Sequence, residues 1–178
     1  KIIEFAFDYA LKNGRKKVTV VHKANVLKAL TGVFLEVGHE VAKKYEGKVK
    51  MDDRIVDATA MQLVMDPWQF DVIVTTNLFG DILTDLGGAV SGGIGLASSA
   101  NLNPARTGPS MFEPVHGSAP DIVGTGKANP TAAILSAALM LDFLGESQAA
   151  DRIRAACAEP VTGNTVEIAD AIAARIQS

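Results

Sequence analysis

Asp81 and Asp85 stand four residues apart in a stretch whose apolar pattern predicts a helix. At this spacing two side chains point to the same side of a helix, and a pair of like charges costs roughly 0.2–0.5 kcal/mol. A sequence tolerates that cost when water screens the pair or when a cation binds between the carboxylates. A hard divalent ion such as Mg²⁺ prefers oxygen ligands of this kind. The spacing alone favours two solvated acids, and the rest of the chain strengthens the interpretation as a metal site.

Lys23 and Asp57 each follow a stretch that predicts a β-strand, namely residues 17–21 and the apolar pair Ile55-Val56. Residues 71–76 predict a further strand directly before the acidic helix. Open parallel sheets bind ligands beyond the carboxyl ends of their strands, and a lysine there can exchange protons with a substrate. The alternatives are a solvated lysine and, for Asp57, a helix N-cap. Together with the two acids of the helix, these residues would supply three metal ligands and one acid–base group.

Residues 113–121 form a second candidate site. One glycine and two prolines predict a rigid, irregular loop whose backbone can approach a ligand closely. Asp121 is expected either to accept hydrogen bonds from ribose hydroxyls or to make an Asx turn. The glycine patterns of the chain match neither the Rossmann fingerprint nor the P-loop. His22 lacks the second histidine or cysteine that a zinc site needs.

The elements that must position these residues alternate between helix and strand, which predicts an α/β layered fold. A helix is expected from the start of the chain to residue 13. A second helix is expected to be capped by Asn25 and to reach residue 42. Residues 43–50 read as a charged connection, and a short helix over residues 58–64 is expected to end before Asp66-Pro67.

Small and turn-forming residues dominate the stretch 92–109, and residues 110–115 are short and apolar. Asn129-Pro130 predicts the start of a helix whose apolarity on most sides implies deep burial. Two further amphipathic helices are expected at about residues 148–158 and 165–176.

The composition is typical of a globular protein: 48% of the 178 residues are hydrophobic and 21% are charged. The net charge of −3 and the lack of a long apolar run give no reason to expect nucleic acid or a membrane as a partner. A single cysteine, Cys157, fits a reducing, cytoplasmic location. The chain starts inside a helical pattern and without an initiator Met, so we expect it to be a segment of a longer protein.

The chain resembles the β-decarboxylating dehydrogenases, the isocitrate/isopropylmalate dehydrogenase family. The motifs that carry the resemblance are His22-Lys23-Ala24-Asn25-Val26-Leu27, Val56-Asp57-Ala58, the run from Asn77 to Asp85, the run from Phe112 to Ile122, and Ala128-Asn129-Pro130-Thr131. The resemblance implies a partial three-layer α/β fold of the isopropylmalate dehydrogenase type, which is not a Rossmann fold. It implies that residues 1–92 belong to the second, dimerisation and metal-site domain, and residues 93–178 to the first, cofactor-binding domain. The absent N-terminal part would carry the substrate-binding arginines and the catalytic tyrosine, so the isolated segment is expected to be inactive.

The resemblance also implies a role for each candidate residue. Asp57, Asp81 and Asp85 would bind Mg²⁺ or Mn²⁺, and Lys23 with Asp57 would form the catalytic pair, Lys23 acting as the base on the substrate hydroxyl. In the family these two residues come from the neighbouring subunit, which implies a homodimer with a shared active site. The cofactor would be held by Glu113, His116, Gly117, Ser118, Ala119, Asp121 and Asn129.

The expected cofactor is NAD, because Asp121 and Ile122 stand where NADP-dependent members that carry a Lys-Tyr pair bind the 2′-phosphate. The implied reaction is the oxidative decarboxylation of a 2-hydroxy dicarboxylic acid. The favoured substrate is 3-isopropylmalate, an intermediate of leucine biosynthesis, and the alternatives are tartrate or malate, and isocitrate or homoisocitrate. A rival from another class is a non-catalytic regulatory subunit or interaction domain on the same fold. The presence of Lys23 and all three aspartates counts against that rival.

Overall fold

The computed structural model describes residues 1–177, which divide into two compact units, Lys1–Val90 and the residues from Ser91 onward. The first unit contains α1 (Ile2–Lys12), β1 (Lys17–His22), the π-helical turn η1 (Lys28–Gly32), α2 (Val33–Ala42), η2 (Lys43–Tyr45), β2 (Lys50–Ile55), α3 (Val56–Met65), η3 (Pro67–Gln69), β3 (Val72–Thr75) and α4 (Asn77–Val90). The second contains η4 (Ile94–Leu96), β4 (Ser98–Asn101), β5 (Met111–Pro114), η5 (Pro120–Ile122), α5 (Thr131–Leu144), α6 (Ser147–Cys157) and α7 (Thr165–Gln177).

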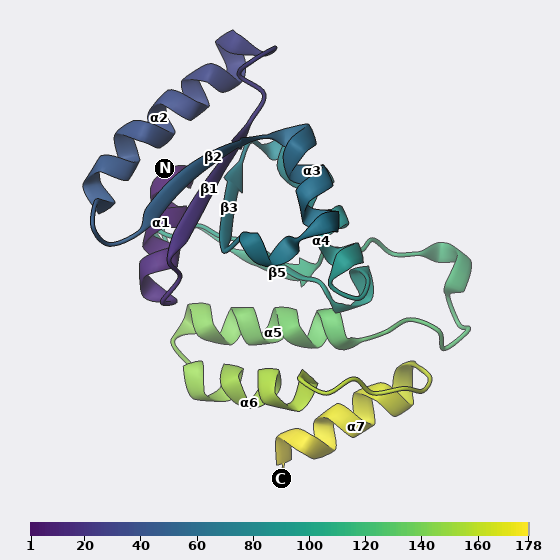
Figure 1. The fold of residues 1–178 in the computed structure, drawn as a ribbon. Coiled ribbons are helices and arrows are strands. Elements are labelled where there is room, and N and C mark those ends of the chain that lie inside the picture. Colours follow the sequence, from purple (N-terminus) through teal and green to yellow (C-terminus); the bar gives the residue numbers. More distant parts are fainter. Residues whose placement is uncertain (178) are drawn as a thin grey trace. The chain divides into compact units, whose positions relative to one another are not determined.

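A three-stranded parallel sheet with the order β2-β1-β3 lies at the centre of the first unit (Figure 1). Side chains of α1 and α2 cover one face of the sheet, where Phe7, Val20 and Val41 belong to one buried cluster. Side chains of α3 and α4 cover the other face, where Leu63 and Leu83 pack with Val21. The unit therefore has the three layers, helix, sheet and helix, that the alternation of elements predicts.

The close approach of α2 to the sheet depends on Gly38. A Cβ atom at this position would lie 3.2 Å from Cγ2 of Val20 and 3.4 Å from Cε of Met51. Gly38 is itself buried in the middle of α2. A side chain there would displace the helix from the central strand.

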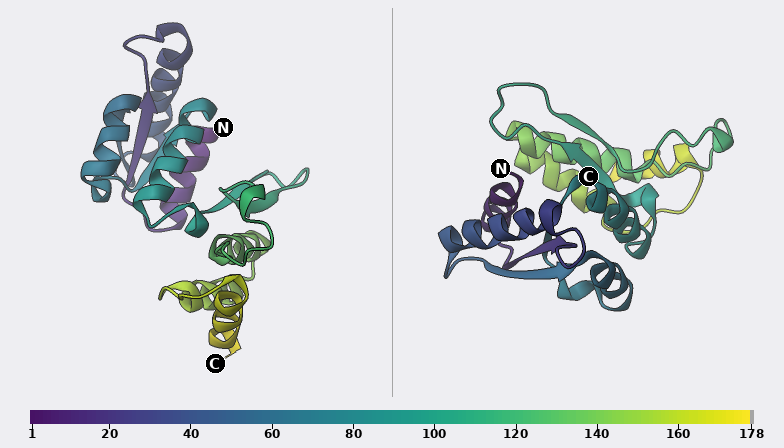
Figure 2. Two further views of the ribbon diagram at one scale, coloured as in Figure 1. Left: turned by 90° about the vertical axis from the view of Figure 1, so that its right-hand side faces the viewer. Right: turned by 90° about the horizontal axis from the view of Figure 1, so that it is seen from above.

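In the second unit, β4 and β5 form an antiparallel hairpin against which α5 packs. Helix α6 packs along α5 and against α7, with Ala156, Ile168 and Ile172 buried between them. The left panel of Figure 2 shows the succession of α5, α6 and α7 in green to yellow. Gly145 ends α5 with the left-handed φ of +94° that glycine adopts at low cost.

Four sequence expectations about elements are wrong. Asn25 does not cap a long helix, because the chain makes a turn there and then the π-helical η1, so α2 begins only at Val33. Strand β2 begins at Lys50, within the stretch read as a charged connection, since its polar side chains find partners on β1. The stretch read as turn-rich contains the strand β4, which antiparallel pairing with β5 stabilises.

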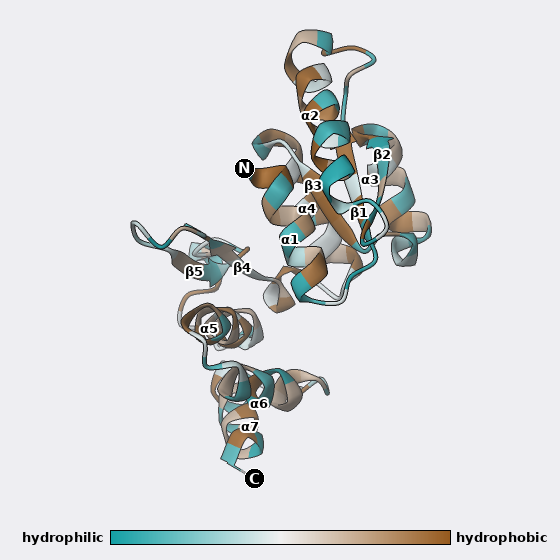
Figure 3. Ribbon diagram, turned by 90° about the vertical axis from the view of Figure 1, so that its left-hand side faces the viewer, coloured by the Kyte–Doolittle hydropathy of each residue, from teal (hydrophilic) through white to brown (hydrophobic). Residues whose placement is uncertain are grey.

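The fourth concerns the burial of α5. Figure 3 shows α5 as a mainly apolar helix, yet only Thr131, Ala132, Ser136 and Ala138 are buried. Leu144 is 59% exposed. The helix is covered on the sides that face the hairpin and α6, and its remaining apolar surface is open in this chain. None of the helices within residues 1–177 combines the length and apolarity needed to cross a bilayer.

Candidate active site

The carboxyl ends of the three parallel strands meet at one edge of the sheet. His22 pairs in register with Ile55, and Val21 with Thr75. Lys23 therefore follows the end of β1 beside the end of β2, and α4 starts just after the end of β3. This is the edge at which the sequence places the lysine and the aspartates, and it is the edge at which open parallel sheets bind ligands.

Lys23 and Asp57 form an ion pair at this edge. The distance from Lys23 Nζ to Asp57 Oδ1 is 2.7 Å, and the Lys23 side chain is 23% exposed whereas that of Asp57 is 69% exposed. The hydrogen bond from Lys23 lowers the pKa of Asp57, and the backbone N–H groups of Asp57 and Ala58 act in the same direction. Asp57 lies in the first turn of α3, where unpaired N–H groups favour a carboxylate. It does not cap the helix, whose N-cap residue is Ile55.

The structure fixes the backbone of Lys23 as well as its side chain. Its carbonyl accepts hydrogen bonds from the N–H groups of Val26 and Leu27, at 3.0 and 2.7 Å. Its own N–H donates to Oγ1 of Thr31 at 3.1 Å. The side chain of Lys23 thus extends from a turn whose backbone is held by hydrogen bonds.

Asp81 and Asp85 lie on α4, both exposed. Neither carboxylate has a hydrogen-bond or ion-pair partner within residues 1–177, so both oxygen pairs are open to a ligand. No group of three or more His, Cys, Asp or Glu side chains in the described part of the chain is gathered closely enough to hold a metal ion. The three aspartates therefore do not form a metal site within a single copy of this chain.

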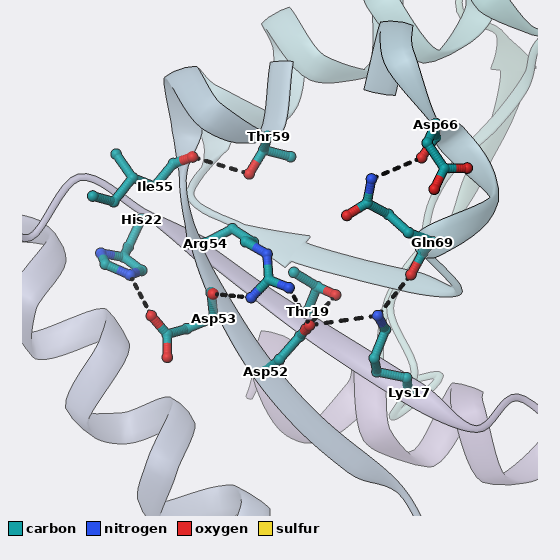
Figure 4. A network of polar contacts seen from close by, with 10 residues as sticks. All are labelled: Lys17, Thr19, His22, Asp52, Asp53, Arg54, Ile55, Thr59, Asp66 and Gln69. Atoms are coloured by element: carbon teal, nitrogen blue, oxygen red, sulfur yellow. Dashed lines mark hydrogen bonds and ion pairs between the residues drawn. The ribbon is translucent and has the colours of Figure 1, made fainter. Parts of the chain in front are cut away.

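Two residues near this edge, His22 and Asp53, carry no role predicted from the sequence. His22 was considered only as a zinc ligand, yet its imidazole is buried and Nε2 lies 3.0 Å from Oδ2 of Asp53 (Figure 4). Its Nδ1 accepts the N–H of Ala24 at 3.0 Å. The signal in the sequence is a histidine that directly follows the β-branched run 18–21, where a buried ring needs two polar partners.

The second candidate group lies in the other unit, on the loop after β5. Glu113 is in β5 with an exposed side chain, and Gly117, Ser118, Ala119 and Asp121 are exposed as well. His116 Nδ1 donates to the carbonyl of Gly117 at 2.9 Å. Ala119 adopts a left-handed backbone with a φ of +43°, which is unusual for a residue with a Cβ. The loop is irregular and presents backbone and polar groups to solvent, in agreement with the prediction from its glycine and prolines.

Asn129 is held from two sides. Its Oδ1 accepts the N–H of Thr131 at 3.0 Å, in the first turn of α5, as an N-terminal cap does. A Cβ on Gly95 would lie 3.2 Å from Cβ of Asn129, so the glycine allows the backbone of η4 to approach this side chain. The side-chain oxygen of Asn129 is therefore bound to the helix, whereas the side-chain NH₂ group of Asn129 has no protein partner within residues 1–177.

Known proteins resemble the chain over nearly its whole length. The sequence is 53% identical over 185 aligned positions to the 3-isopropylmalate dehydrogenase of Corynebacterium glutamicum, an alignment that covers 100% of this chain and 54% of that protein. It is 56% identical over 156 residues to the homoisocitrate dehydrogenase of Methanocaldococcus jannaschii, covering 88% of this chain and 44% of that protein.

The crystal structure of the isocitrate dehydrogenase from Methylococcus capsulatus superposes with a TM-score of 0.92 at 50% identity, covering 99% of this chain and 55% of that one. The chain thus spans about half the length of the relatives it matches. The model of the isocitrate/isopropylmalate dehydrogenase family matches residues 1–175. With this match and with relatives at about half identity over the full chain, the protein belongs to the isocitrate/isopropylmalate dehydrogenase family of oxidoreductases.

Proposed function

We propose that this chain provides the metal- and cofactor-binding half of an enzyme that oxidatively decarboxylates a 2-hydroxy dicarboxylic acid with NAD. The observation that carries the proposal is the ion pair of Lys23 and Asp57, 2.7 Å apart at the carboxyl edge of a parallel sheet. A lysine held beside a carboxylate at that edge suits proton exchange with a bound hydroxyl. An interaction domain would have no need of this arrangement.

The donor chemistry of three residues fits Mg²⁺ or Mn²⁺, which prefer oxygen ligands. Asp81 and Asp85 offer unpartnered carboxylates from one exposed helix, and Asp57 keeps one oxygen free of Lys23. We assign these three aspartates as the metal ligands. A divalent ion, when bound, polarises the substrate's 2-hydroxyl group and stabilises the negative charge that develops as the neighbouring carboxylate leaves.

Lys23 is the group that holds and moves the proton. The ammonium group is 2.7 Å from Asp57, which keeps it oriented toward the edge of the sheet. In the proposed reaction Lys23 first releases a proton to water. Nζ, then a neutral amine, accepts the proton of the substrate's hydroxyl, directly or through a water molecule, as a hydride passes from carbon 2 to NAD, and this restores the ammonium group. The low exposure of this side chain reduces competition from bulk water.

The loop after β5 and Asn129 fit a nucleotide. Glu113, His116, Gly117, Ser118, Ala119 and Asp121 lie along one exposed, irregular segment, and the NH₂ group of Asn129 is left free by its capping bond. The exposed carboxylate of Asp121 suits ribose hydroxyls and would repel a 2′-phosphate, which favours NAD over NADP.

The proposal includes a homodimer with a shared active site. Within one copy the three aspartates do not converge, so the metal site requires Asp57 of one copy and Asp81 with Asp85 of another. Helices α3 and α4, which pack on each other, expose large apolar side chains: Met61, Val64, Met65, Leu78 and Ile82. An apolar surface of this kind, next to the acidic residues of α4, is typical of a protein interface.

The experiment that tests the shared site mixes two inactive variants of the full-length protein. Lys23→Met removes the base and Asp81→Asn removes a metal ligand, so each variant alone should lose turnover. In a mixed dimer with a composite site, both substitutions fall in the same site and the other site is intact. Random mixing should then restore about a quarter of the wild-type turnover per chain.

No recovery on mixing, with mixed dimers verified by mass spectrometry, would show that all four residues act within one copy and would overturn the shared site. Full turnover by either variant alone would overturn the catalytic assignment and would favour the non-catalytic interaction domain.

We propose 3-isopropylmalate as the substrate, since relatives of that name match the whole chain at 50–53% identity. Homoisocitrate is the second candidate, favoured by the relative that is 56% identical. Relatives with three differently named activities are almost equally similar to this chain, so the residues that choose the substrate are expected outside it. A panel of 3-isopropylmalate, homoisocitrate, isocitrate, tartrate and malate, assayed with NAD and Mn²⁺ on the full-length protein, decides between them. A higher kcat/KM for any other acid than for 3-isopropylmalate would contradict the first choice.

A further inference from the structure

The turn formed by Lys23–Leu27 is closed by hydrogen bonds from its own backbone and from two buried side chains. The N–H groups of Val26 and Leu27 both reach back to the carbonyl of Lys23. The two remaining N–H groups next to the lysine's α-carbon, those of Lys23 and Ala24, are bound by side chains outside the turn. Those side chains belong to Thr31 and His22, of which 1% and 5% respectively are exposed.

The hydrogen bonds of His22 define its tautomer. Nδ1 lies 3.0 Å from the backbone nitrogen of Ala24, which can only donate, so Nδ1 carries a lone pair and accepts. The proton of the neutral ring is therefore on Nε2, which donates to Oδ2 of Asp53 at 3.0 Å (Figure 4). Asp53 thus fixes both the orientation of the ring and the nitrogen that faces the turn. The contact is a charge-assisted hydrogen bond rather than an ion pair.

The hydroxyl of Thr31 completes the arrangement. Oγ1 accepts the N–H of Lys23 at 3.1 Å and donates to the carbonyl of Leu27 at 3.1 Å. The hydroxyl thus accepts a hydrogen bond from the first residue of the turn and donates one to the last. Thr31 lies in η1, which is a π-helical turn. Such turns are rare and occur frequently at functional sites.

We propose that His22, oriented by Asp53, and Thr31 are positioning residues for Lys23. The proposal rests on the proposed function of Lys23 as the base. The peptide groups before and after the α-carbon of Lys23 are each held by one of these side chains, so the point from which the long, flexible lysine side chain starts is fixed. The ion pair with Asp57 then fixes the far end. Loss of the hydrogen bond from His22 or from Thr31 lets Nζ of Lys23 move away from the substrate hydroxyl, and a displacement of about 1 Å can cost on the order of a hundredfold in rate.

The test uses paired substitutions in the full-length protein. The amide oxygen of Asn occupies about the place of Nδ1, so His22→Asn keeps the acceptor for Ala24, whereas His22→Gln places its amide near Nε2 and leaves Ala24 unbound. Thr31→Ser keeps the hydroxyl and Thr31→Val removes it at the same volume. Asp52→Asn is the matched control, because Asp52 is next to Asp53 in β2 but binds Thr19, Lys17 and Arg54 on the opposite face of the sheet.

We expect kcat to fall by about tenfold to a hundredfold in His22→Gln and Thr31→Val, with KM and Mn²⁺ affinity unchanged. His22→Asn, Thr31→Ser and Asp52→Asn should stay within about threefold of the wild type. Asp53→Asn still accepts from Nε2 and should show a smaller loss than His22→Gln. Equal kcat values for His22→Asn and His22→Gln, and for Thr31→Ser and Thr31→Val, would overturn the proposal, as would a loss in Asp52→Asn as large as theirs.

A second readout does not depend on turnover. Amide hydrogen exchange at Ala24 should be faster in His22→Gln than in the wild type or His22→Asn, and exchange at Lys23 should be faster in Thr31→Val. Unchanged exchange at these two amides would show that the side chains do not hold the turn. If instead Lys23→Met keeps full activity, the proposed function fails, and the exchange rates still decide whether His22 and Thr31 hold the turn.

Discussion

Lys23 and Asp57 are 34 residues apart in the sequence, yet Nζ of one and Oδ1 of the other are 2.7 Å apart. The pairing of β1 with β2 brings them together, because His22 and Ile55 are opposite each other at the ends of these strands. The contact is therefore a property of one copy of the chain. In the proposed dimer, the residues of the second copy would therefore approach a Lys23–Asp57 pair that is already formed.

Replacing Lys23 by Met in the full-length protein should lower kcat by about 10²–10⁴-fold, since a positioned acid–base group contributes that much. Overall folding should be preserved, because the methionine keeps most of the apolar stem. Lys48→Met is the control, since Lys48 is exposed and its side chain has no partner within residues 1–177. Steady-state kinetics and circular dichroism of both variants check this, and equal activity of the two would contradict it.

Replacing Asp81 or Asp85 by Asn should weaken Mn²⁺ binding by more than about tenfold and should not destabilise the protein. Removing one of two like charges four residues apart should even raise stability by roughly 0.2–0.5 kcal/mol. Asp66→Asn, at an exposed position after α3, should change neither quantity. Titration calorimetry with Mn²⁺ and urea unfolding give the two numbers. Unchanged Mn²⁺ affinity in both variants would leave the two acids as a solvated pair.

Asp71 should contribute stability that disappears in acid. Burial by itself would raise the pKa of Asp71, but the N–H groups of Lys16 and Lys17 at 2.5 and 3.2 Å and the nearby Arg15 hold it below the ordinary value. A lowered pKa in the folded state gives stability above the unfolded-state pKa of about 3.9 and loses it as the pH falls through the folded-state value. Asp71→Asn should cost about 1–2 kcal/mol at neutral pH and less in acid. Urea unfolding at several pH values measures the difference, which a pH-independent cost would contradict.

Replacement by alanine should change the stability of the protein in opposite directions at Gly38 and at Gly32. At Gly38 a Cβ would lie 3.2 and 3.3 Å from the two methyl groups of buried Val20, so Gly38→Ala should destabilise by about 1–3 kcal/mol. At Gly32 the backbone is helical, with φ −63° and ψ −45°, and no atom lies within 4 Å of the added carbon. Gly32→Ala should raise stability by up to about 1 kcal/mol. Urea unfolding of both variants tests this, and the same sign for both would be inconsistent with the packing of α2 on β1.

Tyr45 should ionise late. The hydrogen bond from its hydroxyl to Asp8, 2.7 Å long, raises its pKa to about 12. A raised pKa gives stability that is fully present below the unfolded-state value of about 10 and is lost as the pH rises through the folded-state value. Asp8→Ala should shift the ionisation toward the ordinary range, because the acceptor is gone. The ultraviolet absorbance of phenolate, compared with that of Tyr45→Phe, follows this titration. The prediction fails if the midpoint is the same with and without Asp8.

The periodic helices could be predicted closely from the sequence because their ends carry local signals. The start of α7 is one case. Asn164 Oδ1 accepts the N–H groups of Val166 and Glu167, and Glu167 returns a carboxylate oxygen to the N–H of Asn164. Such a capping box is readable in the sequence, and α7 begins at Thr165 as expected. Strand β3 and the helix after it were likewise marked by a β-branched run and a change of period.

The parts that could not be predicted depend on partners distant in sequence. Most of β2 gives no strand pattern in the sequence, because residues 52–54 are all charged and only the pair Ile55-Val56 indicates a strand. The pairing of Asp52 with Lys17 and Thr19 of β1 explains part of that charge. Helix α2 starts later than predicted, and the residues before it are held by the hydrogen bond from the N–H of Lys23 to Oγ1 of Thr31. In the candidate site, the position of Lys23 and Asp57 at one edge of the sheet could be predicted from the order of strands and helices. The contact of Asp53 with His22 could not be predicted, because it depends on the register of β1 and β2.

The adjacent aspartates of β2 have a consequence for how the chain assembles. Asp52 serves one face of the sheet and Asp53 the other, and a slip of one residue against β1 exchanges the faces of the whole strand. Shifted one way, Met51 would take the place of Asp52 beside the buried hydroxyl of Thr19. Shifted the other way, Arg54 would take the place of Asp53 beside His22. Either error leaves one buried polar side chain of β1 without its carboxylate, so both faces of the sheet oppose misaligned pairing of the strand that brings Asp57 beside Lys23.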